Sequence, residues 1–285
     1  MRELLFLFLV IVFSSCNKVE DVIVDGNIIP PDYTIENSTI DNYINKLYIS
    51  TIGREPTETE FDNAFITLHE SGLSQDSREI IIDEVLNKSE YYNNLFKLES
   101  ANILTGIDTA DINQNILVLN ALLSNSQGLD SMYFYDYLQK MLKLQEVLPG
   151  LSSGAISNIE MHKRMINNNF YDEINMGTEN FVISIFQNFL GRYPSFSETE
   201  NASTMVDGGN ASLFFISGTG KEEFINIFFG SDEYFTGQTN TLFNRYLFRN
   251  PNSEESVNYS LDYMETEDYK ILQKRILSTN EFIGI

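Results

Sequence analysis

Apolar side chains recur at helical spacing along much of the chain. In the segment 43–52 they stand at i, i+1, i+4, i+5 and i+9, which places them on one face of a helix. These residues are Tyr43, Ile44, Leu47, Tyr48 and Ile52. The segment 181–190 has a similar spacing, with Phe181, Val182, Ile185, Phe186, Phe189 and Leu190. The pattern predicts an all-α fold built from amphipathic helices.

A turn motif follows both of these helices and occurs a third time further on. Each copy has an Arg, a Pro two residues later and a Glu four residues beyond the Pro. The copies are Arg54, Pro56 and Glu60; Arg192, Pro194 and Glu198; and Arg249, Pro251 and Glu255. Gly53 and Gly191 precede the first two arginines, where a left-handed residue ends a helix at low cost. The third copy has Phe248 instead, so we predict a corner of a different shape there.

Each proline leads into a capping sequence for the next helix. The segments Thr57-x-x-Glu60 and Ser195-x-x-Glu198 have the form of a capping box. Asn252-x-x-Glu255 is a close variant with Asn as the cap. The three motifs therefore predict helix–turn–helix corners, packed together as an irregular helical bundle.

A second landmark follows each corner and predicts another helix start. The paired residues are Ser89 and Glu90, Asp232 and Glu233, and Asn280 and Glu281. The first of each pair is a favoured N-cap, and the Glu beside it falls in the first helical turn, where negative charge is stabilised. Each unit then has two helices and the start of a third. We expect each corner arginine to bond the landmark glutamate of its unit or carbonyls at the preceding helix end.

These landmarks divide the chain into segments. We predict a signal peptide at 1–15, a flexible tether at 16–38, repeat units at 39–98, 179–238 and 239–285, and a helical insert at 99–178. The insert has spaced apolar positions at 112–123, 133–148 and 156–168, which predict at least three helices. Two glycine-containing segments, 208–210 and 218–220, predict loops inside the second unit.

At these residues the chain resembles a repeat domain of unknown function from large secreted bacterial proteins, whose units read roughly LY-x3-LGR-x-P and then S-x-E-Y. It also looks like a distant relative of the helical phycobilisome linker domain. The resemblance covers about residues 42–96 and 180–285, and it lacks the Gly and Trp common after the Pro in that family. It implies an all-helical, non-catalytic module and brings no catalytic residues with it.

The N-terminal segment has the features of a signal for export. Arg2 is followed by the apolar run 4–13 and then by Ser14, Ser15 and Cys16, the only cysteine. Ten apolar residues at about 1.5 Å each are too short to cross a hydrocarbon core of about 30 Å. The segment Phe-Ser-Ser-Cys resembles a bacterial lipobox, which implies cleavage before Cys16 and its acylation. An ordinary signal peptide with an incidental cysteine is the alternative.

The segment after Cys16 is polar and rich in acidic residues. Lys18 followed by Glu20 and Asp21 resembles the export signal of Bacteroidetes lipoproteins that reach the outer face of the outer membrane. A solvated linker is the alternative. Asp-Thr-Ala at Thr109 and Asp-Ser-Met at Ser131 resemble sites of O-glycosylation in exported proteins of that group.

The charge of the chain limits its partners. The sequence has 18 Lys and Arg against 41 Asp and Glu, a net charge of −23. Nucleic acids and anionic lipid surfaces need basic patches, so both are poor partners for this chain. We expect contact with the membrane through lipid on Cys16, and a protein or glycan partner at the cell surface.

Candidates for chemistry are few, and we predict no cofactor and no metal. His69 and His162 lie among polar residues in predicted helices, which indicates surface positions. No Gly-x-Ser-x-Gly elbow occurs, and the segment 218–221 is not a phosphate loop. The oxygen-rich cluster at Asp108 and Asp111 lacks the glycine and glutamate of an EF-hand, so a helix cap at Asp111 is the better interpretation.

Three functions follow from these observations. The leading hypothesis is a membrane-anchored, exported lipoprotein that acts as a non-catalytic helical binding or assembly scaffold at the bacterial outer membrane. The first alternative is a glycan-binding accessory of an outer-membrane uptake system, which predicts a concave pocket lined by aromatic residues. The second is a hydrolase with paired carboxylates, which predicts two convergent acids with separated pKa values.

Overall fold

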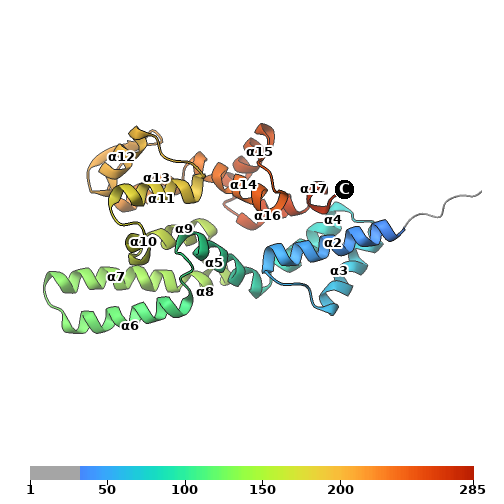
Figure 1. Cartoon of the computed structure of the whole chain (residues 1–285), viewed down its shortest axis with the longest axis horizontal. Helices are drawn as coiled ribbons and strands as arrows, with labels where there is room; N and C mark the ends of the chain where they lie inside the picture. The colour runs from blue at the N-terminus through green and yellow to red at the C-terminus, as the bar shows by residue number, and fades with distance from the viewer. Residues whose placement is uncertain (1–32) are drawn as a thin grey trace, which may run out of the picture. The chain divides into compact units, whose positions relative to one another are not determined.

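Helices form most of the protein, as the apolar pattern predicts, in a computed structural model that describes residues 33–285 (Figure 1). Side chains are described from Asn37 onward. The predicted signal peptide, Cys16 and most of the predicted tether lie outside the described residues. Helix α2 already begins at Tyr33, so the predicted tether, which extends to residue 38, reaches too far into the chain.

The first repeat unit has four helices, one more than the landmarks predict. They are α2 (Tyr33–Ile52), α3 (Glu58–Glu70), α4 (Gln75–Leu86) and α5 (Ser89–Ile103). The apolar face predicted for α2 is buried from Tyr43 to Ile52. The additional helix α4 buries Ile81, Ile82 and Val85. This unit therefore consists of the corner between α2 and α3, the connecting helix α4 and the landmark helix α5.

The insert contains a long helical hairpin and three short helices. Its elements are α6 (Thr109–Asn125), α7 (Leu129–Gln145), α8 (Val147–Ser153), α9 (Asn158–Ile166) and α10 (Asn169–Ile174). Helices α6 and α7 lie side by side and antiparallel, and α7 also packs against α9 (Figure 1). The three predicted segments are helical. The sequence reading missed the break after Gln145 that separates α7 from α8, and it missed α10.

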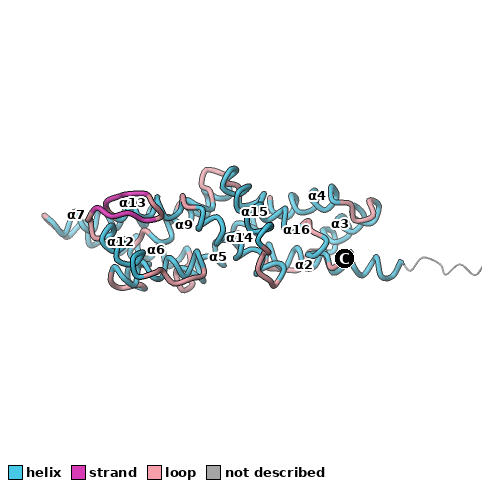
Figure 2. The backbone as a smooth tube through the Cα atoms, turned by 90° about the horizontal axis from the view of Figure 1, so that it is seen from above, coloured by secondary structure: helices cyan, strands magenta, loops and turns pink. Residues whose placement is uncertain are grey.

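The second unit contains the part of the fold that the sequence reading misjudged most. It consists of α11 (Thr178–Leu190), α12 (Phe196–Val206), β1 (Asn210–Leu213), β2 (Ile216–Thr219) and α13 (Lys221–Phe229). The two segments expected to be loops flank and partly form an antiparallel hairpin, in which Leu213 pairs with Ile216 (Figure 2). Its turn is Phe214-Phe215, at φ 50° and 67°.

A Phe-Phe turn is unusual because this left-handed geometry favours Asn and Gly. The ring of Phe214 lies 6.0 Å from that of Phe186 and 6.1 Å from that of Phe228, so core packing offsets the strain. Phe215, by contrast, is fully exposed.

The third unit shares a helix with the second. It consists of α14 (Asp232–Leu247), α15 (Ser253–Thr266), α16 (Tyr269–Leu277) and α17 (Asn280–Ile283). Helix α14 runs unbroken across the predicted boundary at 238/239, and α5 likewise crosses the one at 98/99. The segments are therefore not separate domains, because residues 37–285 form one compact unit with one contiguous core.

The two ends of this unit pack against each other. Helix α16 lies against α4, and the rings of Tyr43 and Phe282 meet edge to face with centroids 5.9 Å apart. Lys46 Nζ donates to the Phe282 carbonyl at 2.9 Å and lies 4.1 Å above its ring. Contacts between residues more than 200 positions apart therefore close the core.

The third corner has the same shape as the second, contrary to the sequence prediction. Phe248 ends α14 at φ 56° and ψ 30°, and Gly191 ends α11 at φ 65° and ψ 21°. Gly53 has φ 76° at the first corner. Phe248 adopts the left-handed conformation although its side chain is 82% exposed. The contacts of Arg249 and Asn252 at this corner therefore impose a geometry that the residue itself disfavours.

Replacing Phe248 by glycine is expected to stabilise the protein. The left-handed conformation costs an L-residue roughly 1–2 kcal/mol, and the exposed ring contributes little packing, so Phe248→Gly should raise the unfolding free energy by about 1 kcal/mol. Urea denaturation measures this change. Phe248→Ala is the matched control, because it removes the ring without freeing the backbone, and it should be near neutral. Equal stabilisation by both variants would contradict the prediction.

Candidate functional site

One arginine at each corner holds two glutamates. Arg192 Nη1 and Nη2 donate to Glu198 Oε2 and Oε1 at 2.9 and 2.6 Å, a bidentate pair. Its Nε donates to Glu233 Oε2 at 3.0 Å, and Nη1 also reaches the Tyr193 carbonyl at 3.1 Å. The guanidinium thus joins the corner, the start of α12 and the start of α14.

The other two corners repeat this arrangement with the equivalent residues. Arg54 binds both oxygens of Glu60 at 2.7 and 2.9 Å and reaches Glu90 at 3.0 Å. Arg249 binds Glu255 with both contacts at 2.7 Å and Glu281 with both at 2.6 Å. The predicted pairing with the landmark glutamate therefore exists at all three corners. The capping glutamate is a second partner that the sequence reading did not assign to the arginine.

Each capping glutamate both caps a helix and binds a corner arginine. Thr57, Ser195 and Asn252 each accept a hydrogen bond from the backbone N–H of the glutamate three residues later. Each glutamate in turn accepts one from the backbone N–H of its cap. The three predicted capping boxes are therefore present. The same carboxylates bind the arginines, so cap and corner form one network.

An aromatic ring six residues before each arginine completes the corner. Arg192 lies 5.0 Å from the ring centroid of Phe186, and Arg249 lies 5.2 Å from that of Phe243. The equivalent distance from Arg54 to Tyr48 is 6.0 Å. These rings belong to the buried faces of α11, α14 and α2, so each guanidinium rests on the core while its polar edge faces the carboxylates.

The landmark helices begin one residue earlier than the sequence prediction. Lys88, Ser231 and Thr279 are the N-cap residues, so Ser89, Asp232 and Asn280 are the first helical residues. The hydroxyls of Ser231 and Thr279 accept from the N–H of Tyr234 and Phe282, three residues on. Packing explains this shift of the helix start by one residue, because the shift places the Tyr234 and Phe282 side chains in the core.

The corner arginines lower the pKa of several of the glutamates that they bind. The pKa of Glu198 falls to about 2, chiefly through its hydrogen bonds with Arg192. Hydrogen bonds with Arg54 and Arg249 likewise hold the pKa of Glu60, Glu255 and Glu281 below the ordinary value. A general acid needs the opposite shift, because it must keep its proton near neutral pH. These carboxylates are suited to permanent ion pairs.

His162 is buried, which contradicts its predicted surface position. It is 1% exposed, and its Nδ1 lies 2.8 Å from the Tyr234 hydroxyl. Its Nε2 lies 3.5 Å from Glu99 Oε2, and Arg245 donates to the other Glu99 oxygen at 3.1 Å. Burial acts to raise the pKa of Glu99, but His162 and Arg245 outweigh it and lower that pKa. This network joins α5, α9 and α14 inside the core.

The remaining predicted residues lie at the surface of the insert and of the first unit. His69 is exposed and stacks on Phe65 at 5.5 Å. Asp108, and not Asp111, is the N-cap of α6, and Asp111 closes its capping box from the third position. Thr109 follows as an exposed residue, and Ser131 is half-buried at the start of α7. In residues 33–285 no group of three His, Cys, Asp or Glu could hold a metal ion.

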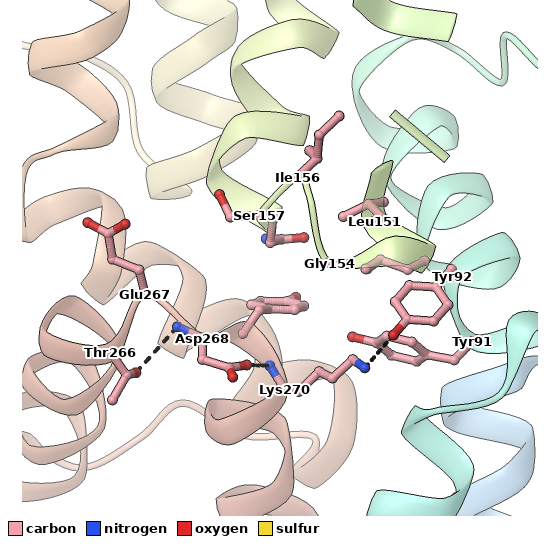
Figure 3. Close-up of a pocket in the computed structure, with 13 residues that line it drawn as sticks. Tyr91, Tyr92, Leu151, Gly154, Ile156, Ser157, Thr266, Glu267, Asp268 and Lys270 are labelled. Atoms are coloured by element: carbon pink, nitrogen blue, oxygen red, sulfur yellow. Dashed lines mark hydrogen bonds between the residues drawn. The ribbon is translucent and has the colours of Figure 1, made fainter. Parts of the chain in front are cut away.

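A pocket lined by tyrosines lies between three segments of the chain (Figure 3). Helix α5 supplies Tyr91, Tyr92 and Leu95; α8, α9 and their connection supply Leu151, Gly154, Ile156, Ser157 and Asn158; and the region from α15 to α16 supplies Thr266, Glu267, Asp268, Tyr269 and Lys270. We call it the tyrosine pocket. Its volume of about 430 Å³ is in the range of small-molecule sites.

The polar groups of the tyrosine pocket lie mostly at its rim. Figure 3 shows Tyr91 and Tyr92 on one side of the pocket and Glu267 on the other. Lys270 Nζ donates to the Tyr92 hydroxyl and, at 3.0 Å, to Asn87 Oδ1. The Asp268 carboxylate caps α16 through the N–H of Lys270 at 2.9 Å. The rim therefore has two carboxylates and one ammonium, and the wall is mainly aromatic and aliphatic carbon, interrupted by the polar side chains of Ser157 and Asn158.

The sequence patterns did not predict this pocket. Tyr91 directly follows Glu90 of the second landmark, and nothing in that motif assigns it to a binding site. The pocket combines residues near 91, 157 and 268, and no local spacing connects these positions. The paired aromatic residues Tyr91-Tyr92 were the only local signal.

Comparison of the chain with protein-family models gives no match, and comparisons with curated proteins and with solved structures give none either. The resemblance to the secreted repeat family therefore stays a prediction. Among the described residues, no helix has the length and apolar character needed to span a membrane.

Proposed function

We propose that this protein is an exported lipoprotein that acts as a non-catalytic helical scaffold at the bacterial outer membrane. The observation that supports this proposal is the repeated corner. Three times, an arginine, two glutamates and an aromatic ring form the same joint between helices. The motifs that stand out in the sequence thus serve to hold helices at fixed angles.

The hydrolase alternative is weaker because the strongest carboxylate pairs are already bound. Glu198 and Glu233 converge, but both contact the same guanidinium, and the pKa of Glu198 is lowered. Glu99 and His162 form a pair suited to proton transfer, yet the His162 side chain is 1% exposed and the Glu99 side chain 10%. A substrate needs access to the atoms that move protons.

Removing a corner arginine tests whether the motif is structural. Arg192→Ala breaks the contacts to two carboxylates and leaves them close together, so we expect the unfolding free energy to fall by about 2 kcal/mol after allowance for solvent screening. Thermal and urea denaturation measure this change. Lys97→Ala, at an exposed position of α5, is the control and should be neutral. An unchanged melt together with a lost enzymatic activity would support the hydrolase instead.

Replacing the cysteine tests the anchor. Cys16 lies outside the described residues, and the predicted acylation depends on its thiol. Cys16→Ser is expected to move the protein from the membrane fraction to the soluble fraction, since stable anchoring requires more than one acyl chain. Fractionation after an alkaline carbonate wash measures the distribution, with His69→Ser as the control. Membrane retention of the Cys16 variant would contradict acylation.

A second candidate function is ligand binding at the cell surface. The observation that favours it is the tyrosine pocket, because a glycan-binding accessory requires a concave site with aromatic walls. The corners serve this function as well, since α5, which starts at the first corner, and α16, which precedes α17 at the third, both line the pocket.

A further inference from the structure

We infer that the tyrosine pocket binds a neutral saccharide through the tyrosine rings and the polar rim. The inference rests on the second candidate function and specifies its ligand. It requires neither the lipid anchor nor the scaffold role. Four features of the pocket support it: its walls, its charges, a buried amide and a strained residue.

The walls offer flat carbon surface. The Tyr91 hydroxyl donates to Gln273 Oε1 at 2.5 Å, and the Tyr92 hydroxyl accepts from Lys270. Both hydroxyls are therefore engaged. The two rings lie 5.1 Å apart at 71°; the half-buried Tyr92 presents ring carbon to the pocket, and Tyr91, which is 2% exposed, adds only a small area. Leu151 and Ile156 extend this surface. A sugar ring has a matching C–H face and a rim of hydroxyl groups that can reach Ser157 and Thr266.

The charges disfavour both ionic classes of ligand. Glu267 and Asp268 at the rim, on a chain of net charge −23, repel an anion. The same carboxylates attract a cation, but the Lys270 ammonium, 4.6 Å from the Tyr92 centroid and 5.6 Å from that of Tyr91, repels it from the ring faces. A neutral ligand with many hydroxyl groups meets neither obstacle. It can donate to the carboxylates and accept from polar groups of the wall.

Asn158 in the pocket wall lacks its full set of partners. The side chain is 5% exposed, and neither Nδ2 nor Oδ1 makes a hydrogen bond of normal geometry within the described residues, although the amide lies close enough to the Tyr263 hydroxyl to act on its pKa. A buried amide in this state costs about 1–3 kcal/mol. A hydroxyl group can both donate and accept, so a sugar in the pocket would satisfy this amide.

Glu267 at the rim is held in a strained conformation. It ends α15 at φ 50° and ψ 14°, although glycine is the residue that favours this region. Its side chain is exposed and no salt bridge engages it in the described part of the chain. Strain of this kind persists where the surrounding structure fixes the backbone, here at the C-cap of α15, where the Glu267 N–H donates to the Tyr263 carbonyl. Here it keeps a carboxylate acceptor beside the pocket.

Two variants separate binding from folding. Asn158→Leu replaces the unsatisfied amide by an apolar group of similar size, and Glu267→Gly releases the left-handed backbone. Both should leave the melting temperature unchanged or raise it, because each removes a cost of the unliganded fold. Both should weaken saccharide binding about tenfold, the equivalent of one hydrogen bond. Tyr133→Ala, at an exposed tyrosine on α7, is the matched control with unchanged affinity.

The probes are oligosaccharides of glucose, mannose and galactose, with an oligomer of galacturonic acid as the anionic probe and one of glucosamine as the cationic probe. Calorimetry on the purified chain measures affinity, and saturation-transfer NMR shows whether ring C–H protons contact tyrosines. Binding of a neutral oligosaccharide that both variants weaken supports the inference. Preference for a charged probe would contradict a neutral saccharide as the ligand, but ligand binding by the pocket would stand. Absence of binding to every probe overturns both, whereas the Arg192 and Cys16 tests of the scaffold stand independently.

Discussion

Gly237→Ala is expected to destabilise the protein by about 3 kcal/mol, although alanine is the better helix former by about 1 kcal/mol. Gly237 lies inside α14, where this helix crosses α11. A Cβ added there would lie 2.1 Å from the Phe189 carbonyl oxygen and 3.1 Å from the Leu190 Cα. Both are backbone atoms of another helix, so they cannot move aside without separating the helices. Urea denaturation of the two proteins measures the difference.

The matched control is Gly191→Ala at the neighbouring corner. An added Cβ at Gly191 meets nothing within 4 Å, so only the left-handed backbone, at φ 65°, opposes it. The expected loss there is about 1 kcal/mol. A Gly237 variant that is as stable as the wild type would show that α11 and α14 do not approach as closely as described. The assignment of α14 as a helix shared by two units would then need revision.

Acid is expected to remove much of the stability of the corners. Hydrogen bonds with the arginines hold the pKa of Glu198, Glu255 and Glu281 below the ordinary 4.5 in the folded state, and that of Glu198 is about 2. A group with a depressed folded pKa stabilises the fold above its unfolded pKa, and this contribution is lost as pH falls toward the folded value. The corners should therefore contribute fully above about pH 5 and progressively less between about pH 4.5 and 2.

The effect should be about 1 kcal/mol per corner, because the ion pairs are partly exposed and screened. Denaturation at a series of pH values measures it, with Arg192→Ala as the comparison. Protonation also relieves the repulsion of a chain with net charge −23, and this acts on both proteins alike. The difference between them isolates the second corner. It should shrink as pH falls from 5 to 2, and a constant difference would show that Glu198 is not titrating against Arg192.

The experiments on the two candidate functions address different parts of the chain. Corner variants change stability, and the cysteine variant changes location. Pocket variants change affinity at constant or higher stability. A scaffold without a small ligand and a saccharide-binding protein therefore differ in one measurable respect, the response of Asn158→Leu and Glu267→Gly to neutral oligosaccharides.

The short-range interactions of the corners follow from the sequence. The capping boxes at Thr57, Ser195 and Asn252 and the bidentate arginine pairs join residues at most six positions apart. Interactions at this range depend on a few backbone dihedral angles. Residue type and spacing were therefore enough to predict the capping boxes, the apolar faces and the all-α fold.

Tertiary packing decided what local spacing could not. It placed Phe248 in a left-handed conformation. It also shifted the landmark caps by one residue, so that the Tyr234 and Phe282 side chains enter the core, and it buried His162 between Glu99 and Tyr234. It also assembled the tyrosine pocket from three distant segments. In each case the favourable term is burial against residues far away in the chain. That term exceeds the local preference of one residue, and a pattern read along the sequence does not contain it.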